Sequence, residues 1–315
     1  MSATNSRKGE LWSVNSRFLL VSETGVWVFF LLCAVITVLT TAGIIIVLGT
    51  ETIAFFRRSG VSVLSFLTGT ELSPGGDPPK YGILPLVWGT MVIAAGSSLI
   101  SLPIGLLSAI YLSEYAPRWL RAVLKPALEL LAGIPTIVYG YLALLLVTPA
   151  LRALCEPFGL QVQTFNALSA CVVVGVMTIP MVSSLSEDVL SAVPRSLREA
   201  GYALGATKFA VSTRIVLPAG LSGVAASFIL AISRAIGETM AVVLAAGSRP
   251  QITLNPLTSV ETMTAYIVAE MGGEASYDSL KHFSLFAVGM ALLLITLSMN
   301  ILSGLVLRRC REVYQ

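Results

Sequence analysis

The sequence is poor in charge. Asp, Glu, Lys and Arg together make up 12% of its 315 residues, against about 25% in soluble globular domains. The formal net charge is only +3, and no run of Lys or Arg occurs. This composition excludes an ordinary soluble domain. We also expect no nucleic-acid partner, because a basic patch and an RNA-binding motif are both missing.

Residues that bind metals or form disulfides are scarce too. There is one histidine, His282, and the four cysteines lie far apart, at positions 33, 155, 171 and 310. None has the spacing of metal ligands, so we predict neither a zinc site nor a disulfide framework. We interpret the cysteines as small packing residues. The lack of a nucleophile–base pair argues against a membrane-bound enzyme.

Long apolar segments are what the sequence does contain. Hydrophobic residues make up 55% of the chain, and its mean hydropathy is +0.84. Six segments are near or above the ~20 residues that cross a bilayer as a helix. The approximate limits are 26–48, 86–113, 127–148, 167–186, 218–246 and 283–307. The first exceeds the apolar region of a signal peptide, about 7–15 residues, so the sequence predicts an all-α integral membrane protein with six transmembrane helices.

The positive charges predict the orientation of these spans. An even number of spans puts both termini on one side. If that side is the cytoplasm, thirteen Lys and Arg residues lie in cytoplasmic segments and six lie outside, which is the bias of cytoplasmic loops. We therefore expect cytoplasmic tails at 1–25 and 308–315, and a six-helix domain at 26–307 with a cytoplasmic loop at about 187–217.

Two external segments are long, 49–85 and 247–282. Residues 50–67 are moderately apolar and fit a short helix along the membrane surface, whereas 72–79 are rich in the Pro and Gly that prevent regular structure. These segments would cap a pathway, meet an external partner or simply connect spans. No internal repeat is visible, which disfavours a secondary carrier built from two matching halves.

The fifth apolar segment carries two charges where hydrocarbon should surround it. Arg234 lies near its middle, and Glu238 follows four residues later. If residues 218–246 form one helix, both charges lie on a face of small residues, opposite the bulky ones. The i,i+4 pairing would offset part of the cost, at least roughly 2.5–3.5 kcal/mol, of a charge at mid-bilayer. Two interpretations stay open: an ion pair that locks helix packing, or a guanidinium that meets a passing anion while the carboxylate keeps binding weak.

The loop before this segment has a specific spacing. It reads Glu199-Ala-Gly-Tyr-Ala-Leu-Gly205, then nine residues, then Ile215-Val-Leu-Pro218. It resembles the EAA loop of ABC importer permeases, E-A-A-x3-G-x9-I-x-L-P, with Gly in place of the second Ala. The resemblance implies a short helix seated in a groove of an ATP-hydrolysing subunit, with Gly205 permitting a turn between two short helices. The positions that match are Glu199, Ala200, Gly201, Gly205, Ile215, Leu217 and Pro218.

Three further segments extend the resemblance over nearly the whole chain. Phe66-Leu-Thr-Gly-Thr-Glu71, Glu129-Leu-Leu-Ala-Gly-Ile-Pro-Thr-Ile-Val-Tyr-Gly140 and Ser233-Arg-Ala-Ile-Gly-Glu-Thr-Met-Ala241 resemble permeases of the bacterial phosphate-specific ABC importer. The first of them is similar to its C-type permease, as opposed to the paired A-type. In that family an Arg and a Glu on the fifth span are implicated in phosphate transport, and they match Arg234 and Glu238. The resemblance thus implies the type I permease fold of ABC importers.

The function that this resemblance implies is that of a permease subunit. It would carry inorganic phosphate across the bacterial plasma (inner) membrane by alternating access. The implied partners are a homologous A-type permease, two ATP-binding subunits and an external phosphate-binding protein. Because the chain lacks the signature G-x-x-x-x-G-K-[ST], ATP and magnesium are expected in the partner ATPase, and no cofactor or metal in this chain. The alternatives are a permease for another oxyanion, such as sulfate or molybdate, and an ATP-independent channel or carrier.

Overall fold

The computed structural model describes residues 16–272 and 279–310, and its side chains between 25 and 305 outside that gap. The chain divides into two compact units, Met1–Glu51 and Thr52–Gln315. In the first unit, residues 25–51 belong to helix α1 (Ser16–Ser59). Its large apolar side chains, such as Trp27 and Phe30, are exposed, which suits a helix surrounded by lipid.

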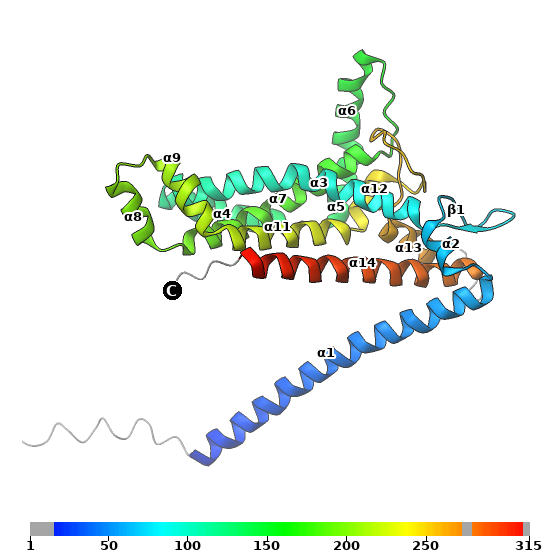
Figure 1. Cartoon of the computed structure of the whole chain (residues 1–315), viewed down its shortest axis with the longest axis horizontal. Coiled ribbons are helices and arrows are strands. Elements are labelled where there is room, and N and C mark those ends of the chain that lie inside the picture. The colour runs from blue at the N-terminus through cyan, green and yellow to red at the C-terminus, as the bar shows by residue number, and fades with distance from the viewer. Residues whose placement is uncertain (1–15, 273–278, 311–315) are drawn as a thin grey trace, which may run out of the picture. The chain divides into compact units, whose positions relative to one another are not determined.

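Four long helices form the centre of the second unit. They are α3 (Leu84–Ile110), α7 (Ala167–Ala192), α11 (Leu221–Ile236) and α14 (Leu280–Cys310) (Figure 1). Glycines bring α3 and α7 together, because a Cβ added to Gly96, Gly105 or Gly175 would lie within 3.0 Å of the other helix. Such close approach at small residues is how helices associate in membranes.

Shorter elements gather at the two ends of these helices. One end, called here the α8 end, holds η2 (Tyr111–Tyr115), α4 (Arg118–Ala132), α8 (Arg195–Ala203), α9 (Lys208–Val211), η5 (Ser212–Val216) and α10 (Leu217–Ala219). The other, the α13 end, holds α2 (Val63–Thr68), β1 (Leu72–Ser73), β2 (Lys80–Tyr81), α12 (Met240–Ala246) and α13 (Met263–Gly272). The elements α5 (Thr136–Leu142), η3 (Ala143–Val147), α6 (Thr148–Cys155) and η4 (Glu156–Phe158) follow one another, and α6 projects from the bundle (Figure 1).

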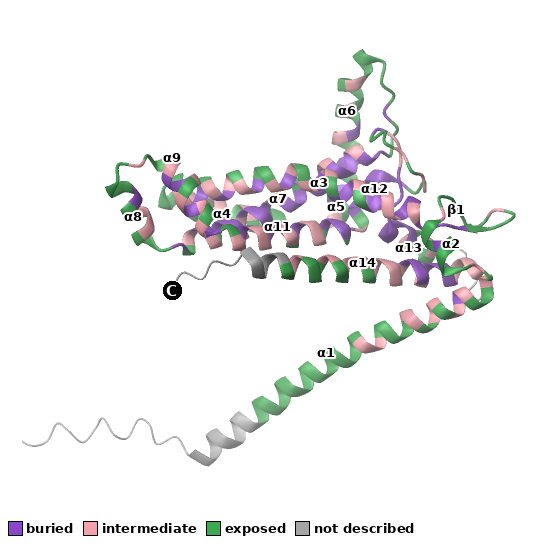
Figure 2. Ribbon diagram, in the orientation of Figure 1, coloured by how far each residue is buried: buried purple, intermediate pink, exposed green. Residues whose placement is uncertain are grey.

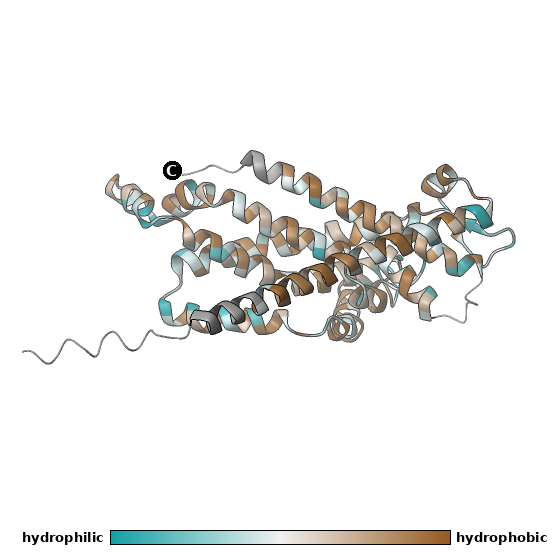
Figure 3. Ribbon diagram, turned by 90° about the horizontal axis from the view of Figure 1, so that it is seen from below, coloured by the Kyte–Doolittle hydropathy of each residue, from teal (hydrophilic) through white to brown (hydrophobic). Residues whose placement is uncertain are grey.

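Burial is concentrated between the helices. Buried residues of α3, α5, α7 and α12 form one apolar cluster, where Figure 2 shows purple ribbon. Large apolar side chains also cover the outer faces, for example Leu99 and Leu107 of α3, and Figure 3 shows hydrophobic residues along most of the helices. Apolar surfaces both inside and outside are expected where the surroundings are lipid.

The helical membrane fold predicted from the sequence is confirmed. Within the described residues, five helices are long and apolar enough to cross a membrane, and a sixth span results if one bent pair is counted. The five are Gly25–Ser59, Leu84–Tyr115, Thr136–Phe158, Ala167–Ala192 and Leu280–Leu305. The pair, Lys208–Ala219 with Leu221–Ile236, is bent by 72°.

Two of the expected spans were wrongly placed. The third was expected at 127–148, but α4 ends at Ala132 and a new helix starts at Thr136. The ring of Pro135 is the cause, because it disfavours a continuous helix through Pro135 and the helical conformation of the residue before it. The fifth was expected at 218–246, but the apolar helix ends at Ile236 and bends near Gly220. In both cases glycine or proline inside an apolar run ended the helix.

One of the two long segments expected outside the membrane, 49–85, is partly ordered. Residues 50–67 are not one surface helix: α1 runs to Ser59, Gly60 turns with a φ of +66°, and α2 follows. Phe66 of α2 then packs edge-on against Phe55, which also contacts Tyr81. In the stretch 72–79, residues 74–79 lack regular structure as predicted, and they connect the two short strands of an antiparallel hairpin that pairs Leu72 with Tyr81. Tertiary packing therefore orders this region where local sequence alone would not.

Candidate transport pathway and coupling loop

The helix that was expected to carry Arg234 and Glu238 is interrupted between them. Helix α11 ends at Ile236, Gly237 caps it, and α12 starts only at Met240. Glycine disfavours helix by about 1 kcal/mol, and the Thr264 hydroxyl donates a 2.8 Å hydrogen bond to the carbonyl oxygen of Glu238. The expectation of a one-turn ion pair on a continuous helix is thus wrong. Among the described side chains, no ion pair joins these two.

Glu238 lies inside the protein at the start of α12. Its side chain is buried, and Oε1 accepts a hydrogen bond of 3.4 Å from the backbone N–H of Ala241. Thr264, which binds its carbonyl, is itself held by Thr262, with 3.0 Å between the two hydroxyl oxygens. A segment 26 residues further along the chain therefore stabilises the break.

Arg234 differs in that its side chain is exposed. It lies within electrostatic reach of the Tyr139 phenol on α5, whose hydroxyl donates a 2.9 Å hydrogen bond to the carbonyl oxygen of Leu131. Its neighbour Ser233 bonds to Asn300 of α14 at 3.2 Å. The small residues Ser227 and Ala231 of the same helix are buried, as expected, and Ser227 bonds to Ser186 of α7. Arg234 thus stands at the end of a well-packed helix with its guanidinium accessible.

The loop of residues 195–218 folds as two short helices joined by a glycine turn. Helix α8 ends at Ala203, Gly205 adopts a φ of +79°, and α9 begins at Lys208. The Thr207 hydroxyl caps α9 by accepting a hydrogen bond from the N–H of Ala210. Gly205 takes the left-handed backbone conformation that glycine adopts without steric cost. The predicted turn between two short helices is therefore confirmed.

The seven positions of the loop motif divide into two groups. Gly201 is buried, and a Cβ there would lie 2.6 Å from Cδ1 of Ile215, so the small residue lets α8 pack on η5. Ile215 and Leu217 contact the buried cluster beneath the loop. The exposed positions are Glu199, Ala200, Gly205 and Pro218. The apolar side chains Leu204 and Phe209, 89% and 70% exposed, flank the turn.

A charge cluster at the α8 end was not predicted from the sequence. The carboxylate of Glu187 on α7 is fully buried and pairs with Arg121 and Lys125 of α4. Ser191 donates a 2.8 Å hydrogen bond to the same carboxylate. Burial alone would lower the pKa of Lys125, but its bonds to Asp188 and Glu187 outweigh this and raise it. Because these partners are more than 60 residues apart, the only signal in the sequence was that the charges have opposite signs.

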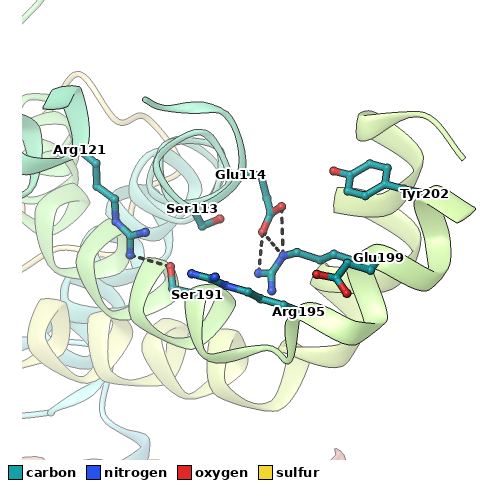
Figure 4. Close-up of a pocket in the computed structure, with 8 residues that line it drawn as sticks. Ser113, Glu114, Arg121, Ser191, Arg195, Glu199 and Tyr202 are labelled. Carbon is teal, nitrogen blue, oxygen red and sulfur yellow. Dashed lines mark hydrogen bonds and ion pairs between the residues drawn. The ribbon is translucent and has the colours of Figure 1, made fainter. Parts of the chain in front are cut away.

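A second ion pair joins the loop to the rest of this end. Arg198 of α8 pairs with Glu114 of η2 at 2.8 Å. Both line a groove of about 360 Å³ between α4, η2, α7 and α8 (Figure 4). The other residues lining it are Ser113, Arg121, Ser191, Arg195, Glu199 and Tyr202. Within the described part of the chain, no three His, Cys, Asp or Glu side chains are grouped so that they would hold a metal ion.

The chain is similar to curated permeases over most of its length. Its similarity to a probable ABC transporter permease protein, YqgH, of Bacillus subtilis (strain 168) is 34% identity over 84% of each chain. A phosphate transport system permease protein, PstC, of Xylella fastidiosa (strain Temecula1) is 36% identical over 78% of this chain and 79% of its own. The PstC of Mesorhizobium japonicum is 33% identical over 80% and 82%.

Solved structures show the same fold at low sequence identity. A chain from a bacterial ABC transporter that imports alginate aligns with a TM-score of 0.59 and 16% identity, over 93% of this chain and 99% of that one. A chain of the MetNI methionine ABC transporter, in an inward-facing conformation, aligns with a TM-score of 0.52 and 18% identity over 73% and 95%. The family of binding-protein-dependent transport system inner membrane components matches residues 101–312. The chain therefore belongs to this family, whose members are the membrane permeases of ABC importers.

Proposed function

We propose that this chain is the permease subunit of an ATP-driven importer of inorganic phosphate. The observation that carries the proposal is the similarity, over about four fifths of the chain, to permeases named for phosphate transport. The fold is consistent with it, because the structural neighbours are permeases of ABC importers. Transport would proceed by alternating access, with the bundle opening first to one side of the membrane and then to the other.

Arg234 is the proposed contact for the anion. The break after Ile236 separates it from Glu238, so its planar donors are not occupied by a neighbouring carboxylate on the same helix turn. A guanidinium binds phosphate oxygens in paired fashion. Glu238 lies four residues away at the start of α12, and its negative charge would weaken the binding enough for release. The two residues would thus act as an attracting and a repelling group.

The proposed coupling loop lies at the cytoplasmic side of the plasma membrane. It was expected at about 187–217, but α7 continues to Ala192, so the loop is the stretch 195–218. The exposed side chains of Leu204 and Phe209 flank its turn and would fill a groove on an ATP-binding subunit. Exposed apolar side chains beside polar ones are typical of docking surfaces. ATP and magnesium would be bound by that partner. A paired homologous permease and an external phosphate-binding protein would complete the complex, with both termini of this chain in the cytoplasm.

Reconstitution tests the proposal. The chain is inserted in vesicles with its paired permease, ATP-binding subunits and phosphate-binding protein, and uptake of radioactive phosphate is followed. We expect uptake that requires both ATP and the binding protein, and that a tenfold excess of sulfate or molybdate does not reduce. Equal competition by those anions would indicate a permease for another oxyanion. Uptake by the chain without an ATPase would indicate a channel or carrier.

A further inference from the structure

One side chain of the coupling loop binds two other elements at once. Arg198 donates from Nε and Nη2 to Oε1 of Glu114, at 3.1 and 2.8 Å. Its Nη1 and Nη2 also donate to the carbonyl oxygens of Val193 and Leu190, at 2.5 and 2.7 Å. The guanidinium therefore ties α8 both to η2 and to the end of α7. Arginine suits this role, because its five donors form a rigid fork.

The pair is largely withdrawn from solvent. The side chain of Glu114 is 5% exposed and that of Arg198 is 16% exposed. Exposed ion pairs contribute little to holding two elements together. Separating a buried pair costs much more free energy, because each buried charge would be left without its partner. Motion of the loop should therefore leave the contact between α8 and η2 intact.

The second helix of the coupling loop, α9, also contacts η2. The ammonium of Lys208, the first residue of α9, lies 4.8 Å from the centre of the Tyr115 ring. Tyr115 directly follows Glu114 in η2. The two helices of the coupling loop thus contact two consecutive residues of η2, one by an ion pair and one by a cation–π interaction. A displacement of the loop would carry η2 with it.

The turn η2 is continuous with the second span. Helix α3 runs directly into it, and the N–H of Tyr111 still bonds to the carbonyl oxygens of Leu107 and Ser108. From Glu114 back to Thr90 the helix extends about 36 Å at about 1.5 Å per residue. At that far end the N–H of Met263 donates to the Thr90 hydroxyl at 3.1 Å. Gly89 lies so close to the carbonyl oxygen of Glu261 that no Cβ would fit.

We propose that the Glu114–Arg198 pair is the connection through which the coupling loop moves α3, and with it the segment around Glu261 at the α13 end. Arg198 is a positioning residue: it contacts neither ATP nor phosphate, and it acts by holding η2 to α8. The inference rests on the proposed function, since it explains how work done on the loop reaches the opposite end of the permease. Helix α7 moves with α3 because glycines pack the two helices closely.

The test uses the reconstituted complete complex and measures phosphate molecules taken up per ATP hydrolysed. Glu114→Gln keeps the size of the side chain and removes its charge, whereas Arg198→Gln removes the guanidinium and with it the bonds to Val193 and Leu190 as well. In each we expect the ratio to fall about tenfold, the change that ~1.4 kcal/mol of coupling free energy produces. The variant carrying both substitutions should fall by the same factor as Arg198→Gln alone, because Glu114→Gln removes no interaction that Arg198→Gln has not already removed. ATP hydrolysis and co-purification of the ATP-binding subunits should persist.

Arg195→Gln is the matched control. It removes the same charge from the same helix, lines the same groove and forms none of the ion pairs described for this part of the chain. It should leave the ratio unchanged. An equal fall in Arg195→Gln, a doubly substituted variant whose losses multiply, or a loss of uptake matched by loss of co-purified ATPase would overturn the proposal. If instead the wild-type complex takes up no phosphate, the proposed function fails, and that result is distinct from any difference between variants.

Discussion

Gly140 of α5 lies directly against Ala241 of α12. A Cβ at position 140 would be 3.0 Å from the Cα of Ala241 and 2.9 Å from the Cβ of Leu244. The two residues come from different motif segments, 129–140 and 233–241. These segments are about a hundred residues apart in the sequence, and the fold brings them into contact. Because Glu238 and the helix break lie within the second segment, their geometry depends on this close contact with α5.

Gly140→Ala should therefore destabilise the protein. A methyl group there would meet backbone, which cannot rotate away, and such overpacking typically costs about 1–3 kcal/mol. We expect a lower thermal unfolding midpoint of the detergent-purified complex. Gly304→Ala is the control, because no atom lies within 4 Å of a Cβ at that helical position. Equal midpoints for Gly140→Ala and the wild type would contradict the packing role.

Arg234→Gln should abolish phosphate uptake while the complex still assembles. Glutamine retains polarity but loses the charge and the forked donors that match phosphate oxygens. Its exposed position, outside the described ion pairs, means that the substitution removes no buried partner. Uptake by reconstituted vesicles and co-purification of the ATP-binding subunits measure the two parts of this expectation. Arg234→Lys, which keeps the charge alone, should retain part of the uptake; undiminished uptake in Arg234→Gln would favour a structural role.

Gly205→Val should weaken the attachment of the ATP-binding subunits. The residue has a φ of +79°, and no atom lies within 4 Å of an added Cβ, so the effect would come from the backbone and not from a clash. A left-handed conformation costs a residue with a Cβ roughly 1–2 kcal/mol. Less ATPase should co-purify with this variant. Gly205→Asn should behave almost as wild type, because asparagine tolerates this conformation; the same loss in both variants would show that the turn needs more than backbone freedom.

The structure shows which parts of this fold are encoded locally. Apolar length predicted the spans, because a bilayer imposes a minimum helix length whatever the neighbours are. The turn at Gly205 was predictable for a similar reason, since glycine between two short helical patterns permits a backbone that other residues disfavour. Both features are set by a continuous stretch of sequence; the turn and four of the six spans agree with the structure, and the two misplaced spans are those in which glycine or proline ends the helix.

The charged residues were less predictable, because their partners are set by packing. The break between Arg234 and Glu238 is stabilised by Thr264, which lies on another element. Glu187 pairs with Arg121 only because α4 lies against α7. In one helix, spacing alone determines which charges meet, but the contacts of a buried carboxylate depend on which helices surround it. The sequence therefore identified Arg234 and Glu238 as candidate residues, but it could not predict the helix break that separates them.

Glu261 lies between the last two spans, in the segment that packs on Gly89 of α3. Its side chain is only 5% exposed. Burial raises the pKa of this carboxyl to about 7; the negative charge of Glu270 adds to the effect and the positive charge of Lys281 opposes it. Glu270 is itself engaged, with Oε2 2.9 Å from the Lys281 ammonium. The carboxyl group of Glu261 is thus mostly neutral in the folded protein below about pH 7.

Stability should therefore fall as pH rises through the interval between about 4.5 and 7. Below the unfolded pKa, Glu261 is protonated in both the folded and the unfolded protein, so its titration does not change the free energy of unfolding. Between the two values the unfolded state releases its proton first, so unfolding becomes easier, by about 3 kcal/mol once pH exceeds the folded pKa. Glu261→Gln, which stays neutral, should raise the thermal midpoint of the purified complex at pH 8 and leave it unchanged at pH 4.5. An equal shift at both values would mean that shape, and not the proton, explains the difference.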